Sequence, residues 1–215
     1  MDRSLIITYM PGLETMTLDE ASDLVLRASA PHPIDCVCWP DVTAYAPLTA
    51  FAVARSDSAL YIRFDVKDMG LRAVVDSDLG PVAQDSCVEF FVQVPGSDEY
   101  WNFEFNCIGM LNASHRVERD KPTRLTAEQL ASVERLSTLG KQPFAEREGM
   151  HEWTLTVKLP LALLGLDSNN LPEQLRGNFY KCGSATAHPH YLAWNEVDGD
   201  TPNFHRPDCF GTLWF

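Results

Sequence analysis

Two neighbouring runs of alternating apolar and polar residues constrain the fold of this chain more than any other feature. Residues 88–94 and 101–107 each place every second side chain on one face, and most of those side chains are Val, Phe or Trp. This period of two is typical of a β-strand with one buried face. The segment between the runs contains proline, glycine and serine, which favour a turn. The two runs therefore predict a β-hairpin.

The expected register of this hairpin pairs Val94 with Trp101, because every pair on one face is then apolar or nearly so. A slip of one residue would destroy that match. The other face would carry three opposed pairs, namely Glu89 with Asn106, Phe91 with Glu104, and Gln93 with Asn102. Polar side chains and one aromatic ring would then line a single surface.

The period of two recurs along the chain. It is clear in residues 60–66 and 153–159, and further strands are expected at 178–182 and 212–215. Helices are rarer. Residues 126–136 are the best helix candidate, because Thr126 and Gln129 have the spacing of a capping box. The sequence therefore predicts an all-β fold, an antiparallel β-sandwich with one or two short helices.

The N-terminal part of the chain has a different pattern. Residues 18–28 have the spacing of an amphipathic helix, and the segment Ala-Pro-His-Pro at 30–33 then interrupts the chain before the period of two begins. We expect residues 1–32 to be an extension that packs on the domain, and residues 33–215 to be one sandwich domain. There is no internal repeat and no linker that would divide it.

Charge excludes several classes of partner. Thirty acidic and seventeen basic residues give this 215-residue chain a formal net charge of −13. That charge repels phosphate backbones and anionic lipid surfaces, so neither nucleic acid nor a membrane is expected as a partner. No signal peptide is recognisable at the start of the sequence. We expect a cytoplasmic protein, or an extracellular one if a leader has been removed; the sequence does not specify an oligomeric state.

Metal and cofactor chemistry has weak support in the sequence. The six cysteines lack the paired C-x-x-C spacing of zinc sites, so we expect buried free thiols. The histidines at 188, 190 and 205 have no further ligand at a fixed spacing. Acidic turns such as 76–78 and 198–200 could hold calcium, although solvated turns fit them better. The expectation is no metal site and no cofactor, with structural calcium as the one alternative.

Catalytic motifs are absent from the sequence. There is no nucleophile elbow, glycine-rich phosphate loop or H-E-x-x-H helix. Glu89 and Glu104, on one face of the hairpin, are the only carboxylate pair that we would nominate for glycoside hydrolysis. Trp194 precedes an irregular segment, residues 196–210, which is typical of a functional loop. This tryptophan is either a ligand platform or part of the core.

Six segments, in order, resemble the family 9 carbohydrate-binding modules and the wider group of DOMON-like, jelly-roll-like sandwiches. They are L-Y-I-R-F-D-V at 60–66, D-S-C-V-E-F-F at 85–91, N-F-E-F-N-C-I-G at 102–109, W-T-L-T-V-K-L-P at 153–160, R-G-N-F-Y-K at 176–181, and F-H-R-P-D-C-F-G-T-L at 204–213. The chain is most similar to a subgroup of stand-alone bacterial proteins with an N-F-Y-K-C-G segment. The resemblance covers about residues 33–215, and it implies two stacked sheets with a sugar site on a concave sheet surface.

The resemblance also implies roles for particular residues. Glu89 and Asn106 take the acidic and amide positions of the family motif, and an aromatic platform would come from Trp194, or from Phe204 with His205. The two-tryptophan clamp of well-known members is not matched, since residues 79–84 contain no tryptophan. Glu104 stands where the binding modules have a basic residue. A cation for the sugar would then come from Arg72, Lys181 or Arg206.

These residues lead to one main functional hypothesis and two alternatives. The main one is non-catalytic binding of a mono- or oligosaccharide, in support of polysaccharide breakdown. The first alternative is a glycoside hydrolase or lyase that uses Glu89 and Glu104. The second is a haem or redox DOMON-type domain, for which Met69, Met110 and the histidines supply atoms but no recognisable pattern.

Overall fold

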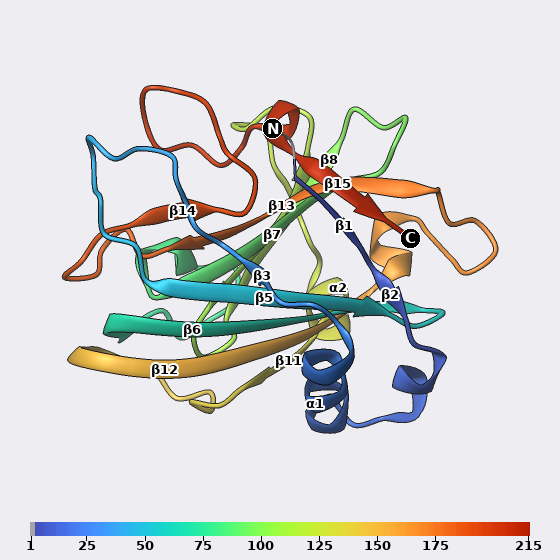
Figure 1. The fold of residues 1–215 in the computed structure, drawn as a ribbon, viewed down its shortest axis with the longest axis horizontal. Coiled ribbons are helices and arrows are strands. Elements are labelled where there is room, and N and C mark those ends of the chain that lie inside the picture. The colour runs from blue at the N-terminus through green and yellow to red at the C-terminus, as the bar shows by residue number, and fades with distance from the viewer. Residues whose placement is uncertain (1–2) are drawn as a thin grey trace.

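The computed structural model describes residues 3–215, which form two stacked β-sheets (Figure 1). The first sheet has nine strands, in the order β1-β15-β13-β7-β8-β9-β10, with β14 pairing with β13 and β4 pairing with β14. Its strands are β1 (Ser4–Ile6), β4 (Cys36–Val37), β7 (Cys87–Gln93), β8 (Tyr100–Asn106), β9 (Leu111–Arg116), β10 (Thr123–Arg124), β13 (Gln174–Cys182), β14 (Tyr191–Ala193) and β15 (Gly211–Trp214). The expected all-β sandwich is therefore confirmed.

The second sheet has six strands, in the order β11-β12-β6-β5-β2, with β3 also pairing with β5. Its strands are β2 (Thr8–Tyr9), β3 (His32–Pro33), β5 (Leu48–Arg55), β6 (Ala59–Ala73), β11 (Glu134–Ser137) and β12 (Phe144–Pro160). The N-terminal segment contributes to both sheets, since β1 runs parallel to β15 and β2 runs parallel to β5. The strands expected at 60–66 and 153–159 lie within β6 and β12, which pair with each other.

Aromatic side chains hold the two sheets together. Phe179 of β13 lies between Phe51 of β5 and Phe90 of β7, with ring centroids 3.6 Å and 4.7 Å away. All three rings are buried. Because β5 belongs to one sheet and the other two strands belong to the second, this stack crosses the centre of the sandwich.

The hairpin of β7 and β8 forms as expected, but its register differs by two residues. Val92, not Val94, lies opposite Trp101, and Glu89 lies directly opposite Glu104. The apolar face is unchanged, because a shift of two residues keeps every side chain on its own face. The partners on the other face do change, so the expected pairing of Glu89 with Asn106 was wrong.

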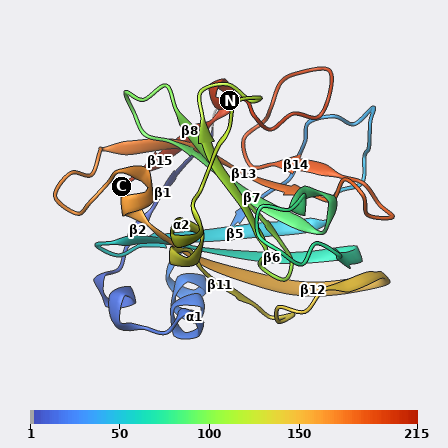
Figure 2. The same cartoon turned by 180° about the vertical axis from the view of Figure 1, so that it is seen from behind.

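Two helices accompany the sheets, α1 (Leu18–Ala28) and α2 (Ala127–Ser132), each begun by a capping box. The first has the expected bounds, and it covers the outer face of the six-stranded sheet, where Tyr61 is buried beneath it (Figure 1). The second is shorter than expected, because β11 begins soon after it (Figure 2). Short 3₁₀ turns lie at Pro11–Thr15, Val82–Gln84, Leu161–Leu164 and Pro207–Cys209. Within residues 3–215, neither helix is long and apolar enough to cross a membrane.

Candidate functional site

The outer face of the nine-stranded sheet carries a second, smaller apolar cluster. Phe91, Tyr100 and Tyr180 project from the sheet into this cluster, and Phe204 covers them from the loop between β14 and β15. The rings of Tyr180 and Phe204 are stacked, with centroids 4.1 Å apart. The indole of Trp39 donates a hydrogen bond of 2.8 Å to the carbonyl of Gly199, which holds that loop against the sheet. The irregular segment expected to carry function therefore packs over the polar face of the hairpin.

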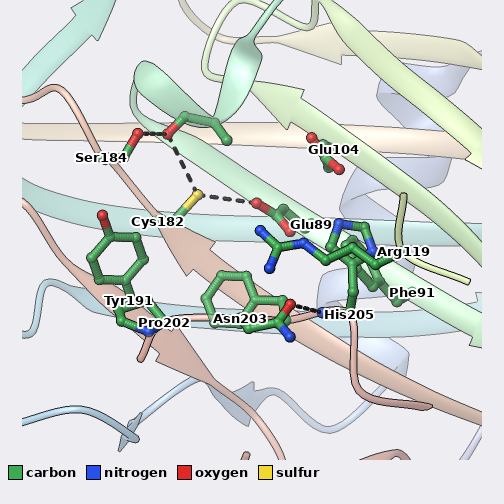
Figure 3. Close-up of a pocket in the computed structure, with 12 residues that line it drawn as sticks. Glu89, Phe91, Glu104, Arg119, Cys182, Ser184, Tyr191, Pro202, Asn203 and His205 are labelled. Carbon is green, nitrogen blue, oxygen red and sulfur yellow. Dashed lines mark hydrogen bonds between the residues drawn. The ribbon is translucent and has the colours of Figure 1, made fainter. Parts of the chain in front are cut away.

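A pocket of about 180 Å³ opens where this loop meets the sheet (Figure 3). Its floor is formed by strands β7, β8 and β13, and its rim by loops that follow β9, β13 and β14. The residues that line it are Ala83, Glu89, Phe91, Glu104, Arg119, Cys182, Ser184, Tyr191, Pro202, Asn203, Phe204 and His205. The pocket thus combines aromatic rings with buried carboxyl groups.

Glu89 lies at the floor of the pocket and is only 3% exposed. Its carboxyl group accepts a hydrogen bond of 3.0 Å from the Cys182 thiol and a longer one, 3.8 Å, from Cys87. Burial, together with the neighbouring Cys182 and Glu104, raises the pKa of Glu89 well above its usual range. Thiols are weak donors, so this carboxyl retains capacity for a stronger hydrogen-bond partner in the pocket.

Glu104 is held differently. One of its carboxylate oxygens accepts from Asn102 and the other from Asn112, both at 2.9 Å. Burial raises its pKa, and the two amide donors oppose that rise. These two amides hold the Glu104 side chain in one orientation beside Glu89.

His205 connects the covering loop to the sheet. Its Nδ1 shares a hydrogen bond of 3.0 Å with the Tyr100 hydroxyl, and its ring lies 5.0 Å from that of Phe91. Burial lowers the pKa of His205 to about 3, with Arg116 and Arg119 acting in the same direction. The imidazole is therefore neutral at ordinary pH and presents one nitrogen to the hydroxyl.

Of the residues expected to form a site, four come together in this pocket, namely Glu89, Glu104, Phe204 and His205. Asn106 and Arg72 do not line it. The Asn106 amide donates to the carboxylate of Asp85 and to a backbone carbonyl, and its oxygen accepts from the Met110 amide. Arg72 forms an ion pair with the same Asp85, at 3.3 Å. Both side chains therefore stabilise the turn before β7 and do not contribute to this pocket.

Lys181 and Trp194 lie between the sheets, away from the pocket. Lys181 is fully buried, where its ammonium group pairs with Asp68 of β6 at 3.2 Å. Trp194 is 2% exposed and packs edge-on against Phe51 and Phe179. Both side chains are buried, so neither contributes to this pocket.

Arg206 also lies outside the pocket. Its guanidinium group pairs with Asp208 at 2.7 Å and donates to the carbonyl of Asp198, so it links two parts of the loop between β14 and β15.

Among the acidic turns considered for calcium, Asp78 pairs both its oxygens with Arg135. The one arginine that does line the pocket is Arg119, on the loop between β9 and β10.

Sequence reasoning missed three notable residues of the pocket: Arg119, Cys182 and Tyr191. A signal existed for Cys182. Phe179 faces the core, so its neighbour Tyr180 faces outward, and Cys182, two residues further along the strand, shares the face of Tyr180. Tyr191 starts β14, next to the segment that drew attention to Trp194. Arg119 lies in a loop with no periodic pattern, so only the tertiary fold places it.

The comparisons with known proteins agree with this architecture. The family model described as carbohydrate-binding family 9 matches residues 20–215. The chain belongs to carbohydrate-binding family 9. The resemblance to the family 9 carbohydrate-binding modules is thereby confirmed.

Solved structures of similar fold include one close relative. A Bacteroides uniformis protein to which carbohydrate binding has been ascribed is 34% identical over the whole of both chains, with a TM-score of 0.92. Two structures of a family 9 module from Caldicellulosiruptor kristjanssonii share the fold alone. The one in complex with glucose is 11% identical, with a TM-score of 0.62, over 99% of this chain and 95% of that one. The one with cellotriose is 10% identical, with a TM-score of 0.59, over 99% and 93%. No curated protein matches the chain.

Two buried histidines give this family 9 protein a predictable response to acid. Burial lowers the pKa of His190 to about 3, as it does for His205, and the adjacent Lys181 contributes at His190. In the unfolded chain a histidine titrates near about 6.5. The unfolded state therefore binds more protons between these values, so stability is fully present above about pH 6.5 and is lost as the pH falls.

The expected slope is at most about 1.4 kcal/mol of unfolding free energy per pH unit for each histidine. Urea denaturation between about pH 7.5 and pH 5 measures it. A His205→Asn variant should show a shallower slope than the unaltered protein. Equal slopes in the two proteins would contradict the assignment.

Proposed function

We propose that the pocket binds a mono- or oligosaccharide without cleaving it. The observation that carries this proposal is Glu89, a buried carboxyl that faces the pocket and whose hydrogen-bond donors within residues 3–215 are thiols alone. A sugar hydroxyl is a stronger donor than a thiol and would replace those contacts. Glu104 stands beside it as a second acceptor, and Arg119 at the rim is the available cation.

The rest of the pocket suits a sugar ring. Phe91, Tyr191 and Phe204 provide apolar surface for the C–H groups of a pyranose, while Asn203 and Ser184 provide polar groups. The pocket is small, about 180 Å³, and the loop between β14 and β15 borders it. This size favours one terminal sugar residue over a continuous length of polymer. The family and its glucose and cellotriose complexes support the same ligand class.

Calorimetric titration with glucose and with cellotriose tests the proposal. A few hydrogen bonds and one packed ring predict dissociation constants from micromolar to millimolar. Glu89→Ala should weaken binding by at least about tenfold, since it removes the principal acceptor. The matched control is Glu99→Gln, which alters an exposed carboxylate in the loop of the same hairpin and should leave affinity unchanged.

Two results would contradict the proposal. One is an absence of binding to every neutral glycan on an array, with folded protein. The other is turnover. Glu89 and Glu104 lie opposite each other on adjacent strands, so release of reducing ends that both Glu89→Gln and Glu104→Gln abolish would establish hydrolysis instead.

A further inference from the structure

The floor of the pocket brings together two cysteines that are far apart in the sequence. Cys87 of β7 and Cys182 of β13 are directly opposed across the two strands, and Glu89 projects from the same face two residues along β7. All three side chains are buried. The other four cysteines lie elsewhere, so this arrangement of thiols and carboxyl arises only from the strand order.

The three side chains are close enough to share one ion. One ligand atom from each, two thiol sulfurs and one carboxylate oxygen, lie within 4.8 Å of one another. The Cys182 sulfur is 3.0 Å from the Glu89 oxygen, and the Cys87 sulfur is 3.8 Å from it. In a tetrahedral zinc site with Zn–S near about 2.3 Å and Zn–O near about 2.1 Å, such ligand atoms are roughly 3.5–3.8 Å apart. Small side-chain rotations therefore suffice to form such a site.

The local charge also favours a cation. Within residues 3–215, Glu89 forms no ion pair, and its hydrogen-bond donors are the same two thiols. Glu104, a second acidic residue, lies directly opposite Glu89 across the strand pair. A buried carboxylate without a cation is costly, and a divalent ion that displaces the protons of the two thiols and of the carboxyl would provide the missing positive charge.

We propose that Cys87, Glu89 and Cys182 form a binding site for Zn²⁺, with its fourth position open to the pocket. Two thiolates and one carboxylate are a donor set that Zn²⁺ accepts, and they disfavour Ca²⁺ and Mg²⁺, which prefer oxygen ligands alone. Binding releases to solvent the two thiol protons and the proton of the Glu89 carboxyl. Three protein ligands and an open position leave room for water or for a hydroxyl of a bound molecule. The site does not depend on sugar binding, and each can be present without the other.

Titration of the fully reduced protein with Co²⁺ tests this proposal, because cobalt reports its ligands by its colour. We expect about one equivalent to bind with a thiolate-to-cobalt charge-transfer band and the intense visible absorption of tetrahedral coordination. Added Zn²⁺ should then bleach both signals. Cys87→Ser and Cys182→Ser should each weaken binding by at least about tenfold, the loss found even for outer-shell partners of a metal.

Controls separate this site from the other thiols. A Cys36→Ser/Cys38→Ser double variant alters one cysteine in β4 and one directly after it. This variant should keep the full charge-transfer and visible absorption of bound cobalt. Glu89→Ala keeps both thiols and should shift the visible band, so the ligand assignment does not rest on the serine variants alone. Near-ultraviolet circular dichroism checks that each variant is folded.

Three outcomes would overturn the proposal. The first is the absence of a charge-transfer band in the reduced protein. The second is a band that survives Cys87→Ser and Cys182→Ser but is lost in the Cys36→Ser/Cys38→Ser variant. The third is a disulfide between Cys87 and Cys182. It would appear as a loss of two titratable thiols in protein kept free of both metal and reductant. Cobalt binding by a protein that binds no sugar would leave the zinc site standing and would contradict the sugar proposal alone.

Discussion

Replacement of Asp68 by asparagine is expected to lower the free energy of unfolding by about 3–5 kcal/mol, the cost of leaving a buried charge without its partner. Asp68 is 2% exposed, at the end of the sandwich between the sheets. Its carboxylate accepts a hydrogen bond of 2.7 Å from Tyr45 and pairs with the ammonium group of Lys181, which is also fully buried. His190 lies beside both groups. The variant leaves Lys181 buried with no counter-charge.

Asp65 offers a matched control on the same strand. It also pairs with a basic residue, Arg63, but on the outer face of the sheet, where its side chain is 40% exposed. Exposed ion pairs contribute about 0–1 kcal/mol, so Asp65→Asn should change stability little. Urea denaturation of the two variants measures the difference. An equally small loss in both variants would contradict the expected cost of leaving Lys181 without a counter-charge.

The fold could be predicted from the sequence because alternation marks the buried face of each strand. Hairpin register could not be obtained in the same way. A shift of two residues returns every side chain to its own face, so the apolar match of residues 88–94 with 101–107 is almost equally good in two registers. The choice depends on the loop, and here β7 ends at Gln93 and β8 begins at Tyr100. Turn geometry, which the residue pattern specifies weakly, therefore decided that Glu89 faces Glu104.

The candidate site was partly predictable for a related reason. Glu89 and Glu104 followed from alternation, and the covering loop drew attention to Phe204 and His205. The inward position of Lys181 was also predictable. Lys181 lies two residues from the core residue Phe179 on the same strand, so the two side chains share the inward face. The role of Asn106 was not predictable, because it depends on Asp85, a partner brought close only by the turn before β7.

The largest loss from a core substitution is expected for Phe179→Ala, about 3–5 kcal/mol of unfolding free energy. Phe179 is fully buried and is the central ring of the stack with Phe51 and Phe90, so its removal leaves a cavity between the two sheets. Neighbouring side chains can fill that cavity only partly, because Phe51 belongs to the opposite sheet and Phe90 is fixed by its own strand.

Phe179→Leu keeps most of the volume and should lose less, whereas Trp214→Ala, which removes a larger ring that is 38% exposed on β15, should lose least. Thermal and urea denaturation of the three variants give this order directly. If Phe179→Ala cost no more than Trp214→Ala, the sheets would not be held together by this stack. The expected order would instead show that the stack of Phe51, Phe179 and Phe90 is a principal contact between the two sheets.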